Sequence, residues 1–110
     1  MDTLTFNIKG KEYKTKRATV GTFVDLWKVK TSLSMGTYGQ MYRFALVGAD
    51  SALNIIDIEA FFSVFSPAVL EDLKPRLISD MGIEDFKELR EVYKEQIAPW
   101  IEKMESLLKD

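Results

Sequence analysis

The sequence contains no cysteine and no histidine among its 110 residues. Without cysteine there is no disulfide and no thiolate metal site, and a chain without cross-links suits a reducing cytoplasm. Without histidine, the commonest metal ligand and the commonest general base are both missing. A glycine-rich phosphate loop is missing as well. These absences argue against an enzyme, and we expect no cofactor, no metal and no small-molecule ligand.

Long apolar runs are also missing. The most apolar stretch, Leu53–Leu77, is interrupted by charged residues and by Pro67, so it cannot span a bilayer. The first residues, Met1–Thr3, lack the basic start and apolar continuation of a signal peptide. With 46% hydrophobic and 29% charged residues, the composition is that of one globular domain. We therefore predict a single soluble domain, located in the cytoplasm, with no membrane partner.

The net charge is small, but the charged residues are unevenly distributed. The formal net charge is −2. Residues 1–30 carry seven basic against three acidic groups, whereas residues 84–110 carry eight acidic against five basic groups. This asymmetry favours self-association or a charged partner. It falls short of the basic stripe of a dedicated nucleic-acid binder, so we expect no nucleic-acid partner.

The first 17 residues have the pattern of a β-hairpin. Apolar and polar residues alternate from Leu4 to Ile8 and again from Glu12 to Thr15, and Gly10 lies between the two runs. A two-stranded hairpin is marginal in water. We therefore expect it to place an apolar face on helices, with the residues Leu4, Phe6, Ile8 and Tyr13.

Helical patterns fill the middle of the chain. Thr22 and Asp25 have the spacing of a capping box, which predicts a helix from there to about Ser34. A second amphipathic helix is predicted after Thr37, with Tyr38, Met41, Tyr42, Ala45, Leu46 and Ala49 on its apolar face.

The apolar stretch Leu53–Leu77 is the predicted centre of the core. Asp57 is a plausible cap for a short helix with Ile58, Phe61, Phe62 and Phe65 on one side. Ser66 and Pro67 predict the start of the next helix, and Pro75 limits it.

A long amphipathic helix is predicted after Gly82. Its apolar stripe continues to Leu108, and Pro99 predicts a kink or break near residues 95–99. The predicted fold class is therefore α+β and mostly α. The hairpin (1–17) packs on a bundle of about four to five helices, made of a helical core (18–80) and a C-terminal helix (83–110) kinked near Pro99.

Two charged patterns have functional and structural interpretations. Asp57 and Glu59 could serve acid–base chemistry, but residues two apart point to different sides of a helix, so a cap and a solvated residue are favoured. The basic hairpin could form a nucleic-acid surface with its aromatic rings. Alternation instead turns those rings toward the core and leaves the lysines as a guard against edge-to-edge aggregation.

The end of the C-terminal helix is the predicted partner-binding site. Five apolar residues form a compact face after Pro99: Trp100, Ile101, Met104, Leu107 and Leu108. This face either packs on the chain's own core or docks on a partner or a second copy. If it docks, alanine at Trp100 and Met104 should abolish association while helicity persists. Unfolding of that variant would instead place the face in the monomer core.

The layout resembles the small tail assembly chaperones of long-tailed bacteriophages. The resemblance covers most of the chain in organisation and is carried by Phe6–Tyr13, by Leu53–Phe62, by Leu70–Lys74 and by Tyr93–Trp100. It implies a non-enzymatic protein that coats the apolar helical tape-measure protein and brings tail-tube subunits to it in the host cytoplasm. Two alternatives remain open: a structural virion component such as a connector or tail-completion protein, and a small bacterial adaptor that binds one partner helix.

Overall fold

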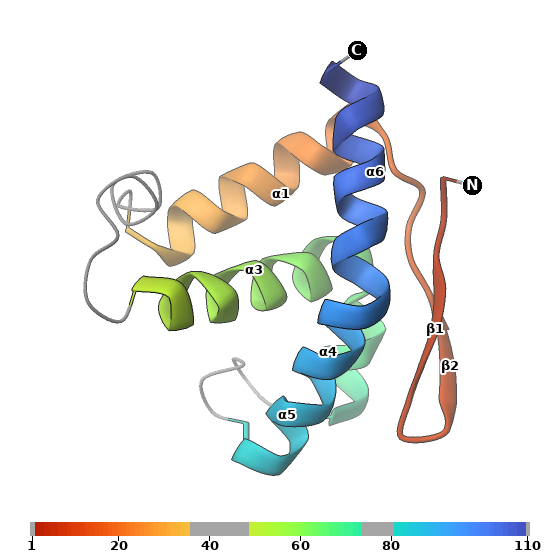
Figure 1. Ribbon diagram of the computed structural model, residues 1–110, viewed down its shortest axis with the longest axis vertical. Coiled ribbons are helices and arrows are strands. Elements are labelled where there is room, and N and C mark those ends of the chain that lie inside the picture. The colour runs from red at the N-terminus through yellow and green to blue at the C-terminus, as the bar shows by residue number, and fades with distance from the viewer. Residues whose placement is uncertain (1, 36–48, 74–80, 110) are drawn as a thin grey trace.

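The computed structural model describes residues 2–35, 49–73 and 81–109 (Figure 1). An N-terminal hairpin is followed by helices α1 (Val20–Leu33), α3 (Ala49–Phe65), α4 (Pro67–Leu73), α5 (Ile83–Val92) and α6 (Ala98–Lys109). A π-helical turn, η2 (Tyr93–Ile97), joins α5 to α6, so the chain ends in one continuous helix of 27 residues. The predicted fold class, a mostly helical α+β domain, is confirmed. The helix expected after Thr37 and the limit expected at Pro75 fall outside the described residues.

The hairpin is formed by β1 (Thr5–Ile8) and β2 (Lys11–Lys14), which pair antiparallel. Lys9 and Gly10 form a two-residue turn in which both have positive φ, 52° and 78°. This is the left-handed geometry of a type I′ turn, whose twist matches that of the strands. Phe6 lies opposite Tyr13, and both are buried, as the alternation predicted.

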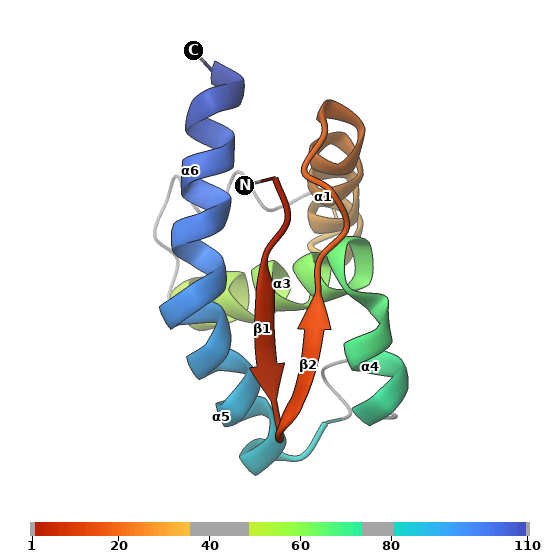
Figure 2. The ribbon, with the colours of Figure 1, turned by 90° about the vertical axis from the view of Figure 1, so that its right-hand side faces the viewer.

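The hairpin lies beside α4 and α5 (Figure 2), and ion pairs fasten it to both helices. Lys9 Nζ lies 2.5 Å from Asp85 Oδ1 on α5, and the Lys9 backbone N–H donates to Glu88. Lys11 Nζ lies 2.5 Å from Asp72 Oδ2 on α4. Part of the positive charge of the hairpin is therefore balanced by acidic residues of the same chain. Because these side chains are exposed to water, each ion pair contributes little to the stability of the fold.

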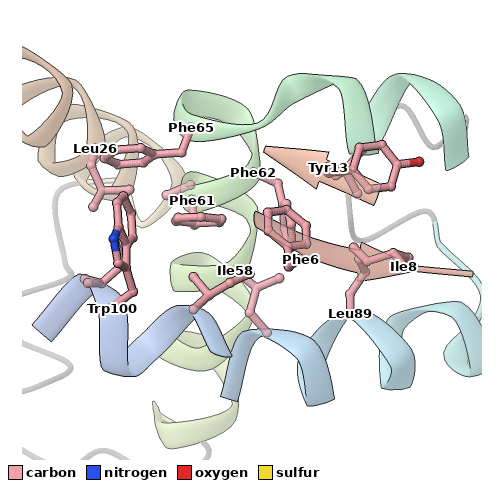
Figure 3. Close-up of a cluster of buried hydrophobic side chains, with 14 of the residues drawn as sticks. Phe6, Ile8, Tyr13, Leu26, Ile58, Phe61, Phe62, Phe65, Leu89 and Trp100 are labelled. Carbon is pink, nitrogen blue, oxygen red and sulfur yellow. The ribbon is translucent and has the colours of Figure 1, made fainter. Parts of the chain in front are cut away.

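Helix α3 runs through the centre of the core (Figure 3). Ile58, Phe61, Phe62 and Phe65 are each at most 1% exposed. At one end of the core, Phe65 packs edge-on against Trp100 of α6, with ring centroids 5.6 Å apart. At the other end, Phe62 packs against Phe6 of the hairpin at 6.0 Å. The stretch that the sequence marks as the centre is therefore confirmed as the element that all the others cover.

Two predicted helix starts were wrong. The capping box of α1 is formed by Thr19 and Thr22, not by Thr22 and Asp25: each threonine hydroxyl accepts the backbone N–H of the other residue. Asp57 caps no helix and lies inside α3, where its Oδ1 is 3.2 Å from Lys30 Nζ on α1. An ion pair between neighbouring helices therefore accounts for this carboxylate. The boundary at Ser66 and Pro67 is confirmed.

The irregularity predicted near Pro99 is present, and its form is a π-helical turn within an unbroken helix. The Ala98 N–H donates to the Tyr93 carbonyl five residues earlier. Pro99 has no N–H to donate and its ring crowds the carbonyl of the preceding turn. A widened turn just before the proline relieves that crowding, so α5 continues into α6.

Candidate functional site

The structure divides the five predicted partner-binding residues into two groups. Trp100, Ile101 and Met104 are at most 8% exposed and belong to the core. For these three the docking interpretation is corrected: they pack on the chain's own core, because α1 and α3 already cover the middle of the stripe. Leu107 and Leu108 are 64% and 39% exposed. They remain the residues for which partner binding is a prediction.

The exposed pair results from the place at which α1 crosses α6. In Figures 1 and 2 the last turns of α6 extend past the start of α1. Leu107 and Leu108 lie three and four residues after the buried Met104, so they continue the same helix face. The apolar stripe of α6 therefore continues for one turn beyond the part that is buried by the rest of the chain.

An open groove of about 470 Å³ lies between this last turn and the first turn of α1. We call it the terminal groove; its lining consists of Asp2, Arg17, Ala18, Thr19, Val20, Phe23, Met104, Leu107 and Leu108. Val20, on the wall opposite the leucines, is 65% exposed. Arg17 Nε donates to Asp2 Oδ2 at 2.5 Å, and this bond lowers the pKa of the Asp2 carboxyl. The groove is thus apolar on both walls, with one ion pair on its lining.

A second groove, of about 580 Å³, lies between α1, α3 and α6. We call it the acidic groove; it is lined by Trp27, Lys30, Thr31, Asp57, Tyr93, Ala98, Ile101, Glu102 and Glu105. Lys30 is paired with Asp57. Glu102 and Glu105 form no ion pair with any residue that the structure describes.

Burial raises the pKa of the Tyr93 hydroxyl well above its usual value of 10.0, and the carboxylates of Asp57, Glu105 and Glu102 add to the effect. Below pH 10 the hydroxyl is protonated in both the folded and the unfolded chain. Above pH 10 the unfolded chain ionises first, so stability falls as the pH rises. The slope expected from this group is about 1.4 kcal/mol per pH unit.

We therefore predict that Tyr93→Phe weakens the alkaline loss of stability. Urea unfolding at pH 9, 10 and 11 measures it, as the difference in slope between wild type and variant. Tyr13→Phe is the comparison: burial and the bond donated to Asp72 also raise the pKa of the Tyr13 hydroxyl, but less than that of Tyr93, so this variant should weaken the alkaline loss to a smaller extent. An equal slope in Tyr93→Phe and wild type would contradict the prediction.

Sequence reasoning missed the α1 side of both grooves. Trp27 is 42% exposed and lines the acidic groove, whereas Phe23 and Leu26 on the same helix are buried. The spacing of Val20, Phe23, Trp27 and Lys30 (three, four and three residues) defines one side of a helix and could have shown this second face. Leu26 lies at the edge of this side and is buried in the core.

Two kinds of site find no candidate in the described parts of the chain. Across residues 2–35, 49–73 and 81–109, no group of carboxylates is arranged to hold a metal ion. Within the same ranges, no helix has both the length and the apolar character that crossing a membrane requires. A further hollow lies along residues 90–98 of the C-terminal helix, and among the described residues only that helix lines it.

Comparisons of this chain with models of protein families, with curated proteins and with solved structures find no match. A functional argument for this chain therefore depends on its grooves and on the resemblance carried by its sequence.

Proposed function

We propose that this chain is a non-enzymatic protein-binding protein that shields an apolar helical segment of a partner, in the manner of a phage tail assembly chaperone. The partner is of the tape-measure type, and the bound chain recruits tail-tube subunits in the cytoplasm of the bacterial host. The observation that carries the proposal is the terminal groove, where Leu107, Leu108 and Val20 leave apolar surface uncovered at the end of an otherwise buried stripe.

The size of this surface suits reversible holding. Covering one leucine-sized side chain fully contributes roughly 1.5–3 kcal/mol. Part of each side chain at the terminal groove is already covered, so the gain from three such residues is a few kcal/mol. Such a gain holds a partner helix in water and still allows subunits to displace it. A groove between two helices is also the shape that an amphipathic helix fills.

The acidic groove supports an enzymatic function less well than it supports partner binding. An efficient general acid or base has a pKa near the working pH. The pKa of Tyr93 is displaced upward, away from neutrality, and the Asp57 carboxylate is held by Lys30. The groove also has no cysteine or histidine to act as a nucleophile or base, since the sequence has neither. Its groups are better suited to contacting a partner than to turning over a substrate.

The test is a protection assay with a tape-measure segment that aggregates when expressed alone. Wild-type chain should keep the segment in solution, as followed by light scattering. Leu107→Ser combined with Leu108→Ser should weaken this protection at least tenfold, because it removes the apolar wall of the terminal groove.

The matched control is Ile55→Ser combined with Ile83→Ser. These two side chains are 39% and 77% exposed, close to the values for the leucine pair, and they line neither the terminal nor the acidic groove. The control variant should protect like wild type. Equal protection by the leucine variant and by wild type would overturn the proposal.

A further inference from the structure

The outer edge of β1 has backbone groups without hydrogen-bond partners. The Leu4 carbonyl accepts an N–H of the segment that follows β2 at 2.9 Å. Because this direction alternates along an antiparallel strand, the backbone groups of Phe6 and Ile8 also point toward β2. Those of Thr5 and Asn7 point away from it. Among the residues that the structure describes, none forms a hydrogen bond with the backbone of Thr5 or Asn7. The edge of β1 therefore presents a free row of N–H and C=O groups.

The neighbouring helix already supplies an acceptor to one end of this row. Lys9 continues the row after Asn7, and its N–H donates to the Glu88 carboxylate on α5 at 3.0 Å. A carboxylate oxygen thus lies where the carbonyl of a neighbouring strand would lie. The helix serves only the turn end of the edge, and the part at Thr5 and Asn7 keeps the spacing of a strand ladder.

The edge of β2 differs from the edge of β1. Lys16, which follows β2, donates its N–H to the Phe65 carbonyl at the end of α3 at 2.8 Å. The residues of β2 whose backbone groups point outward are Glu12 and Lys14, and both side chains are charged and exposed. Charged side chains on an edge strand oppose its pairing with another chain. The corresponding residues of β1 are uncharged, so β1 is the edge that favours an added strand.

The helices beside the hairpin limit the occupant of this edge to one extended segment. In Figure 2, α5 and α6 lie on the β1 side of the hairpin and α4 lies on the β2 side. A second folded copy that joined the β1 edge would bring its own α5 and α6 into the same region. An extended segment needs only the spacing between neighbouring strands, about 4.8 Å.

The side chains of such a segment would alternate between the helix and the solvent. Val92 lies four residues after Glu88 on the same face of α5, and it is half-buried. Leu4, on the inner face of the hairpin, is half-buried as well. Every second residue of an added strand therefore meets apolar side chains, which suits valine or isoleucine. The residues between them face water beside Thr5 and Asn7, which suits uncharged polar side chains.

We infer that the edge of β1 receives an extended segment of a partner protein as a third strand, in which aliphatic and polar residues alternate. Backbone hydrogen bonds supply affinity in this type of recognition, and the alternate side chains supply specificity. The edge is separate from the terminal groove, since Thr5, Asn7 and Val92 are not part of the lining of that groove. The inference therefore goes beyond the proposed function and gives the chain a second docking surface.

The probe is a short designed peptide in which valine and threonine alternate between terminal lysines. Amide hydrogen exchange of the full chain, followed by nuclear magnetic resonance, locates the bound peptide. In the free chain the amides of Thr5 and Asn7 should exchange fast, and those of Phe6 and Ile8 should exchange slowly. The peptide should slow exchange at Thr5 and Asn7 by about tenfold or more.

Two methylated forms of the peptide test the backbone bonds directly. One form has N-methyl groups on its threonines and the other has them on its valines, so each loses the donors of one edge only. In an antiparallel third strand the threonine amides bond to β1, and in a parallel one the valine amides do. One form should bind like the parent peptide and the other about tenfold more weakly, as isothermal titration calorimetry measures. Equal affinity of the two forms would overturn the inference.

The decisive variant of the chain is Asn7→Pro, which removes an outward N–H and keeps every bond between β1 and β2. Glu12→Pro is the matched control, because Glu12 lies opposite Asn7 and its N–H points away from β1 at the other edge. Asn7→Pro should bind the peptide about tenfold more weakly, and Glu12→Pro should bind it like wild type. Thermal unfolding compares the stability of the two variants. The methylated peptides use the wild-type chain, so they decide the question even if a proline variant does not fold.

The outcomes separate this inference from the proposed function. Leu107→Ser combined with Leu108→Ser should bind the peptide like wild type. If this variant loses the peptide, the peptide occupies the terminal groove, and the inference is overturned while the proposed function is supported. An equal loss in the two proline variants also overturns the inference. If the Thr5 and Asn7 amides of the free chain are protected at high concentration and exchange fast on dilution, the occupant is a second copy, and the inference of a partner segment is overturned.

Discussion

Replacing Phe65 with alanine is expected to lower the free energy of unfolding by about 3–5 kcal/mol. The Phe65 side chain is fully buried, and its ring contacts Phe23 on α1 at 5.7 Å, Phe61 on α3 at 5.3 Å and Trp100 on α6 at 5.6 Å. The ring therefore joins three helices. Truncation removes the transfer free energy of the ring and leaves a cavity that three separately anchored neighbours cannot close.

Urea unfolding followed by circular dichroism measures this change. Ser63→Ala is the control, because Ser63 lies exposed on the same helix two residues earlier and its replacement should change stability by less than about 0.5 kcal/mol. A domain of this kind is stable by about 5–15 kcal/mol, so the Phe65 variant should approach the unfolding limit. A loss below about 1.5 kcal/mol would show that the three helices do not depend on this ring.

The features that could be predicted from the sequence are those set by neighbouring residues. The hairpin follows from alternation around Gly10, since a turn with two positive-φ residues is a local property. The start of α4 follows from Ser66 and Pro67, because proline at a first helical position needs no partner elsewhere. The position of the π-helical turn follows from Pro99, because a proline disturbs the turn that precedes it in the same helix.

The features that could not be predicted depend on distant residues. Aspartate is a common helix-capping residue, which is why the sequence favoured a cap at Asp57. In the structure Asp57 lies inside α3 and pairs with Lys30, which is 27 residues earlier on another helix. Thr19 and Thr22 both carry hydroxyls suited to an N-cap. When the helix starts at the earlier residue, each hydroxyl accepts the backbone N–H of the other threonine.

The candidate site shows the same division. Helical periodicity gave all five apolar residues of α6 and their common face. Periodicity could not predict at which residue the buried part of the stripe ends, because that depends on how α1 crosses α6. The structure places the limit between Met104 and Leu107. The α1 walls of the two grooves were missed because Val20 and Trp27 become a surface only when α6 lies beside them.

The boundary between the buried Met104 and the exposed Leu107 leads to a second prediction with a large effect. The variant with alanine at both Trp100 and Met104 is expected to unfold rather than merely to lose a partner. Single truncations of such residues cost about 3–5 kcal/mol for tryptophan and about 2–5 kcal/mol for methionine. Both side chains are 8% exposed, and the Trp100 ring packs edge-on against Phe65. The combined loss is comparable with the whole stability of the domain.

Thermal unfolding followed by far-ultraviolet circular dichroism distinguishes the two halves of the stripe. The Trp100 and Met104 double variant should lose most of its helical signal at room temperature. Leu107→Ser with Leu108→Ser should retain that signal and lower the stability by about 1–2 kcal/mol, because Leu107 is 64% exposed and only the 39% exposed Leu108 is mostly covered. If the Trp100 and Met104 variant stayed fully helical and lost only partner binding, the boundary between core and docking surface would lie earlier on α6. Folding and binding therefore share one continuous stripe, and the position of the first turn of α1 decides which residues serve each.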